Sequence, residues 1–403
     1  MNHLKNSVIF RDPSWLREHI FSILEFYYPT CIDLENGGYY SCFLDDGTIC
    51  DDKTKHLVST CRFIYNFSIG AILGGSPDYV PAAEHGLRFL QHHHLDQING
   101  GYFWLLKGNK LADSNKYAYG HAFVLLAASR AYQAGIKWAR TIIEYVFDVL
   151  ENHFWQEEHE LYADQISSDW TNVSPYRGQN ANMHLCEAML AAFESTNDTK
   201  YLQRAYQLAK SVTIKLASQS GALIWEHYDV NWNIDWTYIE TSQSKREFRP
   251  YGFIPGHSIE WSKLLLILER HVAQPWLVQR ARQLFQSAWS KSRDIQYGGL
   301  FYSLTPEGAL MDTDKYYWVM AETIGASALL AERLEEEFYW NVYDLTFAYS
   351  SVYLIDHHYG GWYQKLYRTN LKYGNVKSPP PKTDYHPIAN CYEAIRSFIK
   401  TRN

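Results

Sequence analysis

Clustered positive charge is the clearest thing that this sequence lacks. Lys and Arg number 37 against 44 Asp and Glu, so the formal net charge is −7, and no basic stripe is present. Proteins that bind nucleic acid neutralise its phosphates with clustered Lys and Arg. We therefore expect no nucleic acid among the partners of this protein.

Long apolar runs are missing as well. KLLLIL, at residues 263–268, is about the longest, and it falls far short of the roughly 18–20 residues that cross a membrane. The N-terminal stretch MNHLKNSVIFRDPSW has no continuous apolar core of the kind that marks a secretory signal peptide. The sequence therefore predicts no membrane partner and a cytoplasmic location.

Signatures of metal, phosphate and nucleotide binding are also missing. The sequence contains no Walker loop, no G-x-G-x-x-G after a strand, no G-x-S-x-G elbow and no H-E-x-x-H. The run His92–His94 resembles a metal tract. Because consecutive residues on a helix point in different directions, we interpret it as a solvated helix end. We expect neither a metal nor a cofactor.

Cysteine is sparse and shows no pairing pattern. The chain has six cysteines and no C-x-x-C pair. A large chain without a secretion signal favours reduced, mostly buried thiols over disulfides. The six residues are Cys31, Cys42, Cys50, Cys61, Cys186 and Cys391.

Aromatic residues, in contrast, are abundant. They make up 16% of the chain, with 32 Tyr and 14 Trp. Their rings have large apolar faces, and Tyr and Trp add a hydrogen-bonding group. Two interpretations follow: an aromatic core between many helices, or a sugar cleft in which rings stack on C–H faces.

A weak internal repeat organises the chain. NGGYYSCFLDDG begins at Asn36, NGGYFWLLKGNK at Asn99, YGGLFYSLTPEG at Tyr297 and YGGWYQKLYRTN at Tyr359. HELYADQ from His159 and SGALIWEHYD from Ser220 are degenerate copies, spaced about 60 residues apart except for one longer interval. In each copy a turn is followed by alternating aromatics, which predicts a short strand or hairpin.

Helical periodicity fills the intervals between the copies. Segments such as WLREHIFSILEFYY and ETIGASALLAERLEEEF place apolar residues at i, i+3, i+4 and i+7. Each interval holds two helices of common length, so six intervals give about twelve helices. Helix pairs can stack into an open solenoid or close into a ring. We predict an all-α fold, an (α/α)6 barrel with short β-hairpins at one end, as a single catalytic domain over residues 1–403.

Polar residues interrupt otherwise apolar helices at a few points. In RGQNANMHLCEAMLAAF, which begins at Arg177, Asn180, His184 and Glu187 share one helix face by their spacing. A buried polar group without a hydrogen bond costs about 1–3 kcal/mol. The stripe is therefore either a satisfied network between helices or a binding site.

A second stretch, FRPYGFIPGHSIEWSKLLL, spans Phe248 to Leu266 and lies in the long interval. Its Pro-Gly pair predicts a helix that starts near His257, with Glu260 three residues later on the same face. A helix N-terminus disfavours a protonated imidazole, so His257 is suited to act as a base. Arg249 is suited to stabilising a developing oxyanion. The alternative is a helix cap beside a surface charge.

Further polar residues stand out along the chain. In KYYWVMAETIGA, Trp318 and Glu322 lie at i and i+4, which places a stacking platform beside a carboxylate. TDYHPIANCYEA contains His386 at the end of the last loop. Arg62 lies in the apolar TCRFIYNFSIGA, and YAYGHAF adds Tyr119 and His121. A buried Arg needs an anionic or hydrogen-bonding partner.

These stretches together resemble the N-acylglucosamine 2-epimerase superfamily, and specifically its mannose isomerase branch. The similarity rests on RGQNANMHLCEA, RPYGFIPGHSIEWSKLLL, YYWVMAE, CRFIYNFS and the late YHP, so it covers nearly the whole chain. The resemblance implies the same (α/α)6 barrel and chemistry at sugar C1 and C2 without metal or cofactor. It implies that His257 and His386 are the catalytic acid–base pair. It implies a substrate-binding shell of Arg62, Tyr119, Asn180, His184, Arg249, Glu260, Trp318 and Glu322, with Arg249 the least secure match because its spacing to the next histidine varies.

The chemistry that this resemblance implies is aldose–ketose isomerisation. A C2–H beside an aldehyde is weakly acidic, and a neutral imidazole can remove it if the enediolate is stabilised. We assign the C2-to-C1 proton transfer, through a cis-enediol, to His386 and assistance in ring opening to His257, although the two roles could be exchanged. The expected substrates are mannose and fructose, with glucose and lyxose as further candidates.

Three other functions stay open on the sequence alone. A sugar 2-epimerase that interconverts mannose and glucose would use both histidines as bases. A glycoside hydrolase on the same barrel would need two carboxylates, for which Glu260 and Glu322 could serve. A non-catalytic binding protein would leave a free sugar unchanged. Assembly of the chain into a homo-oligomer is compatible with all of these functions.

Overall fold

Helices account for most of this protein. The computed structural model describes residues 7–108, 110–221, 223–242 and 248–400, and these form twelve α-helices and only short strands. Packing divides the chain into two units: unit 1 comprises Met1–Pro29, Phe43–Cys50 and Pro255–Asn403, and unit 2 comprises Thr30–Cys42 and Asp51–Ile254. The expectation of a single domain over residues 1–403 stays a prediction.

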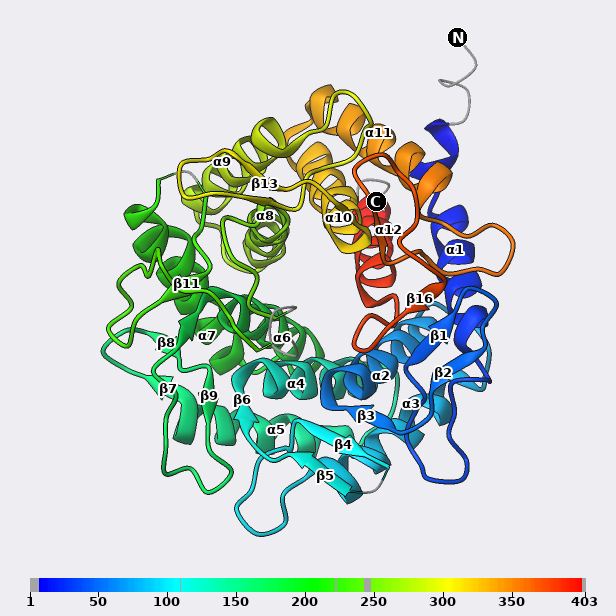
Figure 1. Ribbon diagram of the computed structural model, residues 1–403, viewed down its shortest axis with the longest axis vertical. Helices are drawn as coiled ribbons and strands as arrows, with labels where there is room; N and C mark the ends of the chain where they lie inside the picture. The colour runs from blue at the N-terminus through cyan, green and yellow to red at the C-terminus, as the bar shows by residue number, and fades with distance from the viewer. Residues whose placement is uncertain (1–6, 109, 222, 243–247, 401–403) are drawn as a thin grey trace. The chain divides into compact units, whose positions relative to one another are not determined.

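Unit 2 is built from three pairs of helices that follow one another in the chain. Within it, α2 packs against α4 and α4 against α6, while α3, α5 and α7 each pack on the helix before them (Figure 1). Its helices are α2 (Leu57–Ile72), α3 (Tyr79–Phe89), α4 (Ala118–Gln133), α5 (Ala139–Val149), α6 (Gln179–Thr196) and α7 (Thr199–Lys210).

The two kinds of helix in unit 2 differ in their burial. Every residue of α2 from Leu57 to Gly70 is buried, as expected of a helix that other elements surround. In α5 the buried positions include Ile142, Ile143, Val146 and Phe147, which form one apolar stripe. The amphipathic helices therefore cover the buried ones.

Unit 1 repeats this arrangement with one difference. α8 packs on α10 and α10 on α12, and α9 and α11 pack on α8 and α10. The partner of α12, however, is the first helix of the chain, α1, so the ends of the sequence form one helix pair. The helices of this unit are α1 (Pro13–Tyr27), α8 (Pro255–Glu269), α9 (Pro275–Ser292), α10 (Tyr317–Leu334), α11 (Glu337–Tyr353) and α12 (Tyr385–Lys400).

Short antiparallel strands lie before several of the buried helices, in agreement with the short strands that the repeat predicted. Four strands lead directly into a buried helix, and each pairs with a strand from the next copy of the repeat. The pairs are β3–β4 before α2, β6–β9 before α4, β10–β11 before α6 and β14–β15 before α10. The strands are β1 (Cys42–Leu44), β2 (Ile49–Asp51), β3 (Thr54–His56), β4 (Leu105–Lys107), β5 (Lys110–Asp113), β6 (Lys116–Tyr117), β7 (Trp155–Gln156), β8 (Leu161–Tyr162), β9 (Gln165–Ile166), β10 (Arg177–Gly178), β11 (His227–Tyr228), β12 (Ser303–Leu304), β13 (Leu310–Asp312), β14 (Lys315–Tyr316), β15 (Lys365–Leu366) and β16 (Val376–Ser378).

A buried Lys–Asp pair ties the Gly-Gly turn to the following helix in several copies. In the first copy Gly37 and Gly38 have φ of 81° and 69°, values that only glycine adopts easily. Asp33 caps this turn and binds Nζ of Lys55 at 2.7 Å. Equivalent pairs are Lys116–Asp96, Lys315–Asp294 and Lys377–Asp356, and in the degenerate third copy Arg177 donates to Gln156 instead.

Two expectations about local structure need correction. Cys42 and Cys50 are disulfide-bonded, whereas Cys31, Cys61, Cys186 and Cys391 are free and buried, so the prediction of reduced thiols was right for four residues and wrong for two. The error arose because these two cysteines lie on neighbouring strands, a proximity that spacing does not reveal. His94 is buried and contacts the carbonyl of Phe103, so the predicted solvated helix end was wrong for this residue.

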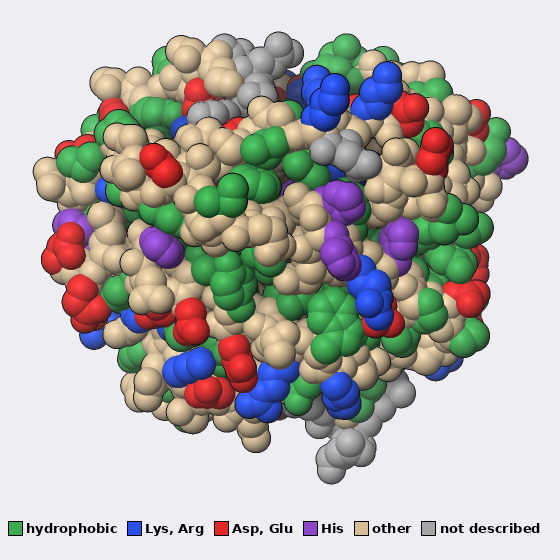
Figure 2. All heavy atoms as spheres, turned by 90° about the horizontal axis from the view of Figure 1, so that it is seen from below, with side chains coloured by type: hydrophobic (Ala, Val, Ile, Leu, Met, Phe, Trp, Pro, Cys, Tyr) green, Lys and Arg blue, Asp and Glu red, His purple; other side chains and the backbone are tan. Residues whose placement is uncertain are grey.

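The surface agrees with the charge pattern of the sequence. On the face drawn in Figure 2, the coloured acidic and basic side chains are interspersed and form no basic patch in that view. Within the described ranges, no helix is long and apolar enough to cross a membrane.

Candidate active site

Both candidate catalytic histidines lie at the starts of helices in unit 1. His257 is in the first turn of α8, which begins at Pro255, two residues before the predicted start. His386 is in the first turn of α12. Each is less than 10% exposed. Between these two helices in the packing order lies α10, which carries Trp318 and Glu322.

Trp318 contacts both histidine rings. Its indole stacks on His257 with ring centroids 5.0 Å apart, and it lies 5.7 Å from the ring of His386. The indole of Trp318 is thus shared by the two imidazoles, and its role as a stacking platform for substrate stays a prediction.

Glu322 binds His386 directly. Its Oε1 accepts hydrogen bonds from Nδ1 of His386 and from Nδ2 of Asn390, both at 2.8 Å, and its Oε2 accepts from Nζ of Lys263 at 2.6 Å. Burial alone would raise the pKa of Glu322, but Lys263 and His386 bring it below its ordinary value. An ionised carboxylate only accepts hydrogen bonds, so Nδ1 of His386 carries a proton, and in the neutral imidazole the lone pair is on Nε2.

Glu260 completes this group. It lies one turn after His257 on α8 and is fully buried. A carboxylate oxygen of Glu260, one of Glu322 and a ring nitrogen of His386 lie within 4.8 Å of one another, close enough for a metal ion to bridge them. Glu322 and His386, however, already bind each other, and the ammonium of Lys263 occupies the second oxygen of Glu322.

Unit 2 brings together the other predicted residues, beginning with Arg62 and Tyr119. Arg62 on α2 is buried and donates from Nη2 to the hydroxyl of Tyr119 on α4 at 3.2 Å. Its guanidinium lies 4.7 Å from the ring centre of Phe123. Tyr119 in turn meets the ring of His184 edge to face at 5.0 Å. A phenol and an aromatic face are thus among the partners of this buried arginine.

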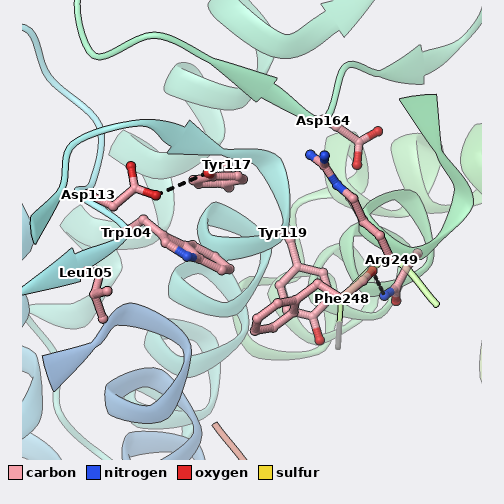
Figure 3. Close-up of a pocket in the computed structure, with 10 residues that line it drawn as sticks. Trp104, Leu105, Asp113, Tyr117, Tyr119, Asp164, Phe248 and Arg249 are labelled. Carbon is pink, nitrogen blue, oxygen red and sulfur yellow. Dashed lines mark hydrogen bonds between the residues drawn. The ribbon is translucent and has the colours of Figure 1, made fainter. Parts of the chain in front are cut away.

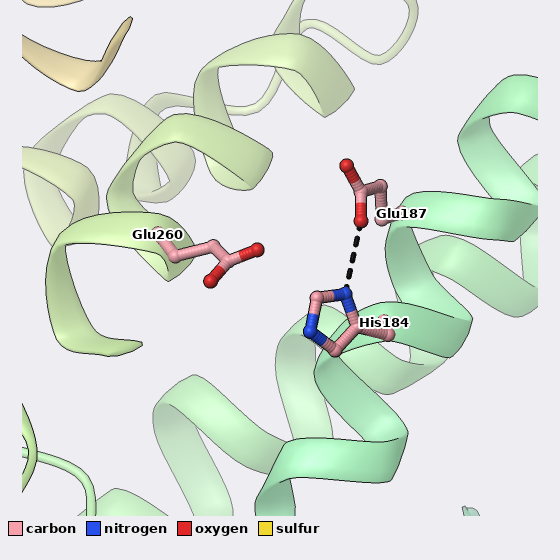
Figure 4. A group of neighbouring side chains, drawn as sticks. All are labelled: His184, Glu187 and Glu260. Carbon is pink, nitrogen blue, oxygen red and sulfur yellow. Dashed lines mark hydrogen bonds and ion pairs between the residues drawn. The ribbon is translucent and has the colours of Figure 1, made fainter. Parts of the chain in front are cut away.

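His184 and Glu187 confirm the polar stripe predicted on α6. Nδ1 of His184 donates to Oε2 of Glu187 at 3.0 Å, a contact that Figure 4 draws. His184 is buried and Glu187 is half-buried. This bond fixes the orientation of the imidazole and places its proton on Nδ1.

Asn180, at the head of the same stripe, holds a loop. Its Nδ2 donates to the carbonyl oxygen of Phe248 at 3.1 Å. The ring of Phe248 stacks on His56 and lies against Trp104 and Tyr119. Phe248 and Arg249 thereby close one side of a cavity of about 80 Å³, whose other walls include Trp104, Asp113, Tyr117, Tyr119, Asp164 and Asn180 (Figure 3).

Arg249 is firmly held at this cavity. It donates to Glu240 at 3.1 Å and to Gln165 at 3.2 Å, and its guanidinium lies 3.9 Å from the ring centre of Tyr176. Burial disfavours its charge, but Tyr176 and the carboxyl of Asp164 hold its pKa above the ordinary value. Arg249 is therefore a fixed cation on the cavity wall.

Asp164 is a titratable wall residue that the sequence did not single out. Burial raises its pKa to about 7, although Arg249 and the backbone N–H of Gly178, which donates to Oδ2 at 2.6 Å, act in the opposite direction. Asp164 lies within the degenerate HELYADQ copy of the repeat, and this position was the only available signal.

Lys263 and Asn390 were missed as well. Lys263 lies inside the apolar run KLLLIL, where a lone lysine was a signal that went unused. Asn390 is four residues after His386 and also donates to its carbonyl oxygen at 2.9 Å. Within unit 1 the predicted residues His257, Trp318, Glu322 and His386 are in contact. Within unit 2 the same is true of Arg62, Tyr119 and His184, and of Asn180 with the loop that carries Arg249.

Comparisons with known proteins agree with this arrangement. The family model for N-acylglucosamine 2-epimerase (GlcNAc 2-epimerase) matches residues 38–390. The chain belongs to the N-acylglucosamine 2-epimerase family. A member of this family, the D-mannose isomerase of Marinomonas mediterranea, is 46% identical over 390 residues, which cover 96% of this chain and 98% of that protein. The D-mannose isomerase of Thermobifida fusca is 33% identical, over 87% of this chain and 85% of its own length.

A solved structure gives the same result for the fold. A crystal structure of D-mannose isomerase superimposes with a TM-score of 0.93 at 46% identity, covering 96% of this chain and 98% of the other. The fold class of this family member is therefore the all-α (α/α)6 barrel, which confirms the prediction from the sixfold repeat.

Proposed function

We propose that this protein is an isomerase that interconverts D-mannose and D-fructose. The observation that carries the proposal is the contact between His386 and Glu322, which leaves the basic lone pair of the imidazole on Nε2. Relatives that cover almost the whole chain are named D-mannose isomerase, which supports the same activity here.

In the proposed reaction His386 removes the proton from C2 of the open-chain aldose. Nε2 takes the proton, the C2–H electron pair forms the C1–C2 double bond, and the carbonyl oxygen at C1 becomes a hydroxyl by taking the proton of the C2 hydroxyl, which leaves the negative charge on the C2 oxygen. Return of the proton from His386 to C1 of this cis-enediolate, as the C2 oxygen forms the carbonyl group, gives the ketose. A neutral imidazole is suited to both transfers near neutral pH.

His257 is the group that we assign to ring opening. Its imidazole lies in the first turn of α8, and we assign to it the acceptance of the anomeric proton. The stack on Trp318 fixes the plane of its ring. Because Trp318 contacts both imidazoles, an exchange of the two roles is compatible with the same geometry.

The remaining predicted residues are proposed to bind the sugar. Trp318 offers an aromatic face to the sugar. Hydrogen-bonding groups come from Arg62, Tyr119, Asn180, His184, Arg249 and Glu260. Glu322 was predicted as a binding residue too, but both its oxygens have protein partners, so we propose that it orients His386. The substrates are monosaccharides, with glucose and lyxose as further candidates, and further copies of the chain are the proposed assembly partners.

We propose that the reaction needs no metal or cofactor. A cation at Glu260, Glu322 and His386 would compete with the ammonium of Lys263 for the carboxylate of Glu322. Activity that disappears on dialysis against a chelator and returns with a divalent ion would contradict this part of the proposal.

An epimerase is the second candidate. Interconversion of mannose and glucose at C2 needs a base on each face of the enediolate, and two imidazoles on one indole favour such a pair. A hydrolase is disfavoured, because Glu322 is bound to Lys263 and its pKa lies below the ordinary value, which is unsuited to a general acid.

Product analysis tests the proposal directly. Mannose, glucose and fructose are each incubated with the protein in heavy water, and NMR follows the products and the deuterium at C1 and C2. We expect mannose to give fructose with part of the C2 hydrogen carried to C1. Glucose with full deuteration at C2 and no fructose would replace the isomerase by the epimerase.

A cytoplasmic location is also part of the proposal, supported by the four buried free thiols. Alkylation of the protein in freshly lysed cells, followed by mass spectrometry, counts its free thiols. A Cys42–Cys50 disulfide present before lysis would point to an oxidising compartment instead.

A further inference from the structure

One buried ion pair of unit 1 differs from the Lys–Asp pairs that hold the Gly-Gly turns. Lys263 on α8 and Glu322 on α10 have side chains that are 2% and 0% exposed. The pairs Lys55–Asp33, Lys116–Asp96 and Lys315–Asp294 tie a hairpin turn to the strand before a helix. Lys263–Glu322 instead joins two buried helices and continues to a histidine.

The connection runs through the two oxygens of Glu322. Oε2 accepts from Lys263 and Oε1 accepts from Nδ1 of His386. Asn390 donates to the same Oε1 and to the carbonyl oxygen of His386, so both the ring and the backbone of the histidine are held. Three helices thus contribute to one chain of hydrogen bonds: α8, α10 and α12.

We propose that Lys263 is a positioning residue that sets the proton affinity and the tautomer of His386 through Glu322. The inference rests on the acid–base role proposed for His386. A buried carboxylate that faces an imidazole stabilises the imidazolium form. The ammonium of Lys263, bound to Oε2 of Glu322, offsets part of the negative charge of this carboxylate and so stabilises the imidazolium less. The imidazole of His386 therefore stays neutral and able to accept a proton near neutral pH.

The rings of α10 and α12 that lie against His386 carry no positive charge. From α10 the ring of Trp318 lies 5.7 Å away, and that of Tyr317 lies 6.0 Å away. From α12 the ring of Tyr385 lies 4.9 Å away. Glu260 on α8 adds a second carboxylate near the same imidazole. Lys263 contacts one of these two acids directly and can therefore balance their charge.

The experiment compares the pH dependence of mannose turnover in the parent protein, Lys263→Met and Lys263→Arg. Without the ammonium, Glu322 favours imidazolium, so the acid limb of kcat/KM for Lys263→Met moves to higher pH by about one unit. We expect kcat at neutral pH to fall by up to about tenfold, the limit for a one-unit shift, while KM changes less than about threefold. Lys263→Arg keeps the charge and is expected to restore most of the turnover and the parental pH profile.

The matched control is Lys116→Met. It removes an equally buried lysine whose partner, Asp96, belongs to a turn and not to the histidine network. We expect it to lower the melting temperature without moving the pH profile. If Lys263→Met does not fold, Lys263→Gln replaces it, since glutamine keeps a hydrogen-bond donor without the charge.

A second measurement separates this inference from the proposed function. The imidazole 15N shifts of His386, assigned by comparison with His386→Gln, report its tautomer and titration midpoint without any substrate. A parent protein that leaves mannose unchanged overturns the proposed function, and the 15N titration then still tests Lys263. A folded Lys263→Met or Lys263→Gln protein with an unchanged midpoint and unchanged Nδ1 protonation overturns the inference. Failure of both neutral variants to fold also overturns it, in favour of a purely structural ion pair.

Discussion

At the scale of single residues, the hydrogen-bond partners of a buried histidine indicate its role. His121 and His386 are both buried and both lie in the first turns of helices. His121 accepts from the backbone N–H of Tyr102 and contacts the carbonyl of Tyr117, and burial lowers its pKa to about 3. It is a structural residue, whereas His386 contacts a carboxylate and keeps its lone pair on Nε2.

The first prediction concerns the proposed catalytic pair. His257→Ala and His386→Ala should each reduce kcat by at least about 10²-fold, the lower range for a general acid or base. Circular dichroism should show an intact fold. His121→Ala, the comparison variant, should lower the melting temperature and leave kcat per folded molecule nearly unchanged. Near-normal turnover in either of the first two variants would remove that histidine from the mechanism.

The second prediction separates binding from chemistry at Arg249. Lysine cannot reproduce the planar contacts with Tyr176, Glu240 and Gln165. If Arg249 binds the substrate, Arg249→Lys should raise KM for mannose about tenfold with a smaller change in kcat. Steady-state kinetics measure both values. A fall in kcat at constant KM would instead assign Arg249 to stabilisation of the enediolate.

At the scale of the elements, close contact between two buried helices holds the histidine network. A Cβ added to Gly325 on α10 would lie 1.9 Å from Oδ1 of Asn390 on α12. Glycine is unfavourable in a helix, so its presence here has a packing reason. Only a residue without a side chain lets Asn390 reach Glu322 and His386.

The third prediction uses this contact. Gly325→Ala should lower the free energy of unfolding by about 1–3 kcal/mol, because overpacking outweighs the gain in helix propensity. In an Asn390→Ala background the amide is gone and only Cβ of residue 390, 3.0 Å from the added carbon, remains close, so the same change should destabilise the protein much less. Urea unfolding of the four proteins gives the coupling. Equal effects of Gly325→Ala in both backgrounds would contradict the proposed contact.

At the scale of the whole molecule, buried neutral histidines set the response to acid. Burial lowers the pKa to about 4 in His19, His94 and His227, and to about 3 in His56 and His121. In the unfolded chain a histidine has a pKa of about 6.5. Between these values the unfolded chain binds protons that the folded protein does not, so stability is lost as pH falls.

The fourth prediction follows from this sign. Stability should be greatest above about pH 6.5 and should fall steeply toward pH 4, by up to about 1.4 kcal/mol per pH unit for each such histidine. Asp164 acts in the opposite direction, because its raised pKa of about 7 stabilises the folded state at lower pH, and it offsets part of the loss. Urea unfolding at pH 8, 6 and 5 measures the slope. Equal stability at pH 8 and pH 5 would contradict the prediction.

The fifth prediction tests the single domain expected over residues 1–403. One domain should unfold in one cooperative transition, with equal calorimetric and van't Hoff enthalpies. Two separate transitions in a calorimetric scan would show that unit 1 and unit 2 unfold independently.

The sequence by itself determined the features that depend on local spacing. The sixfold repeat, the alternation of hairpins with helix pairs and the start of α8 near His257 follow from turns and from the 3.6-residue period. The shared face of Asn180, His184 and Glu187 follows from the same rule, and the His184–Glu187 bond bears it out.

Only the tertiary structure decided which groups meet across elements. Glu322 lies 59 residues from Lys263 and 68 from Asn390, and no local period relates residues at such distances. Pairing between helices depends on which faces pack together, and this turned Glu322 from a predicted sugar ligand into a proposed partner of His386. The same reason applies to the Cys42–Cys50 bond and to the burial of His94 and Asp164, because burial and proximity are properties of the packed molecule and not of the order of its residues.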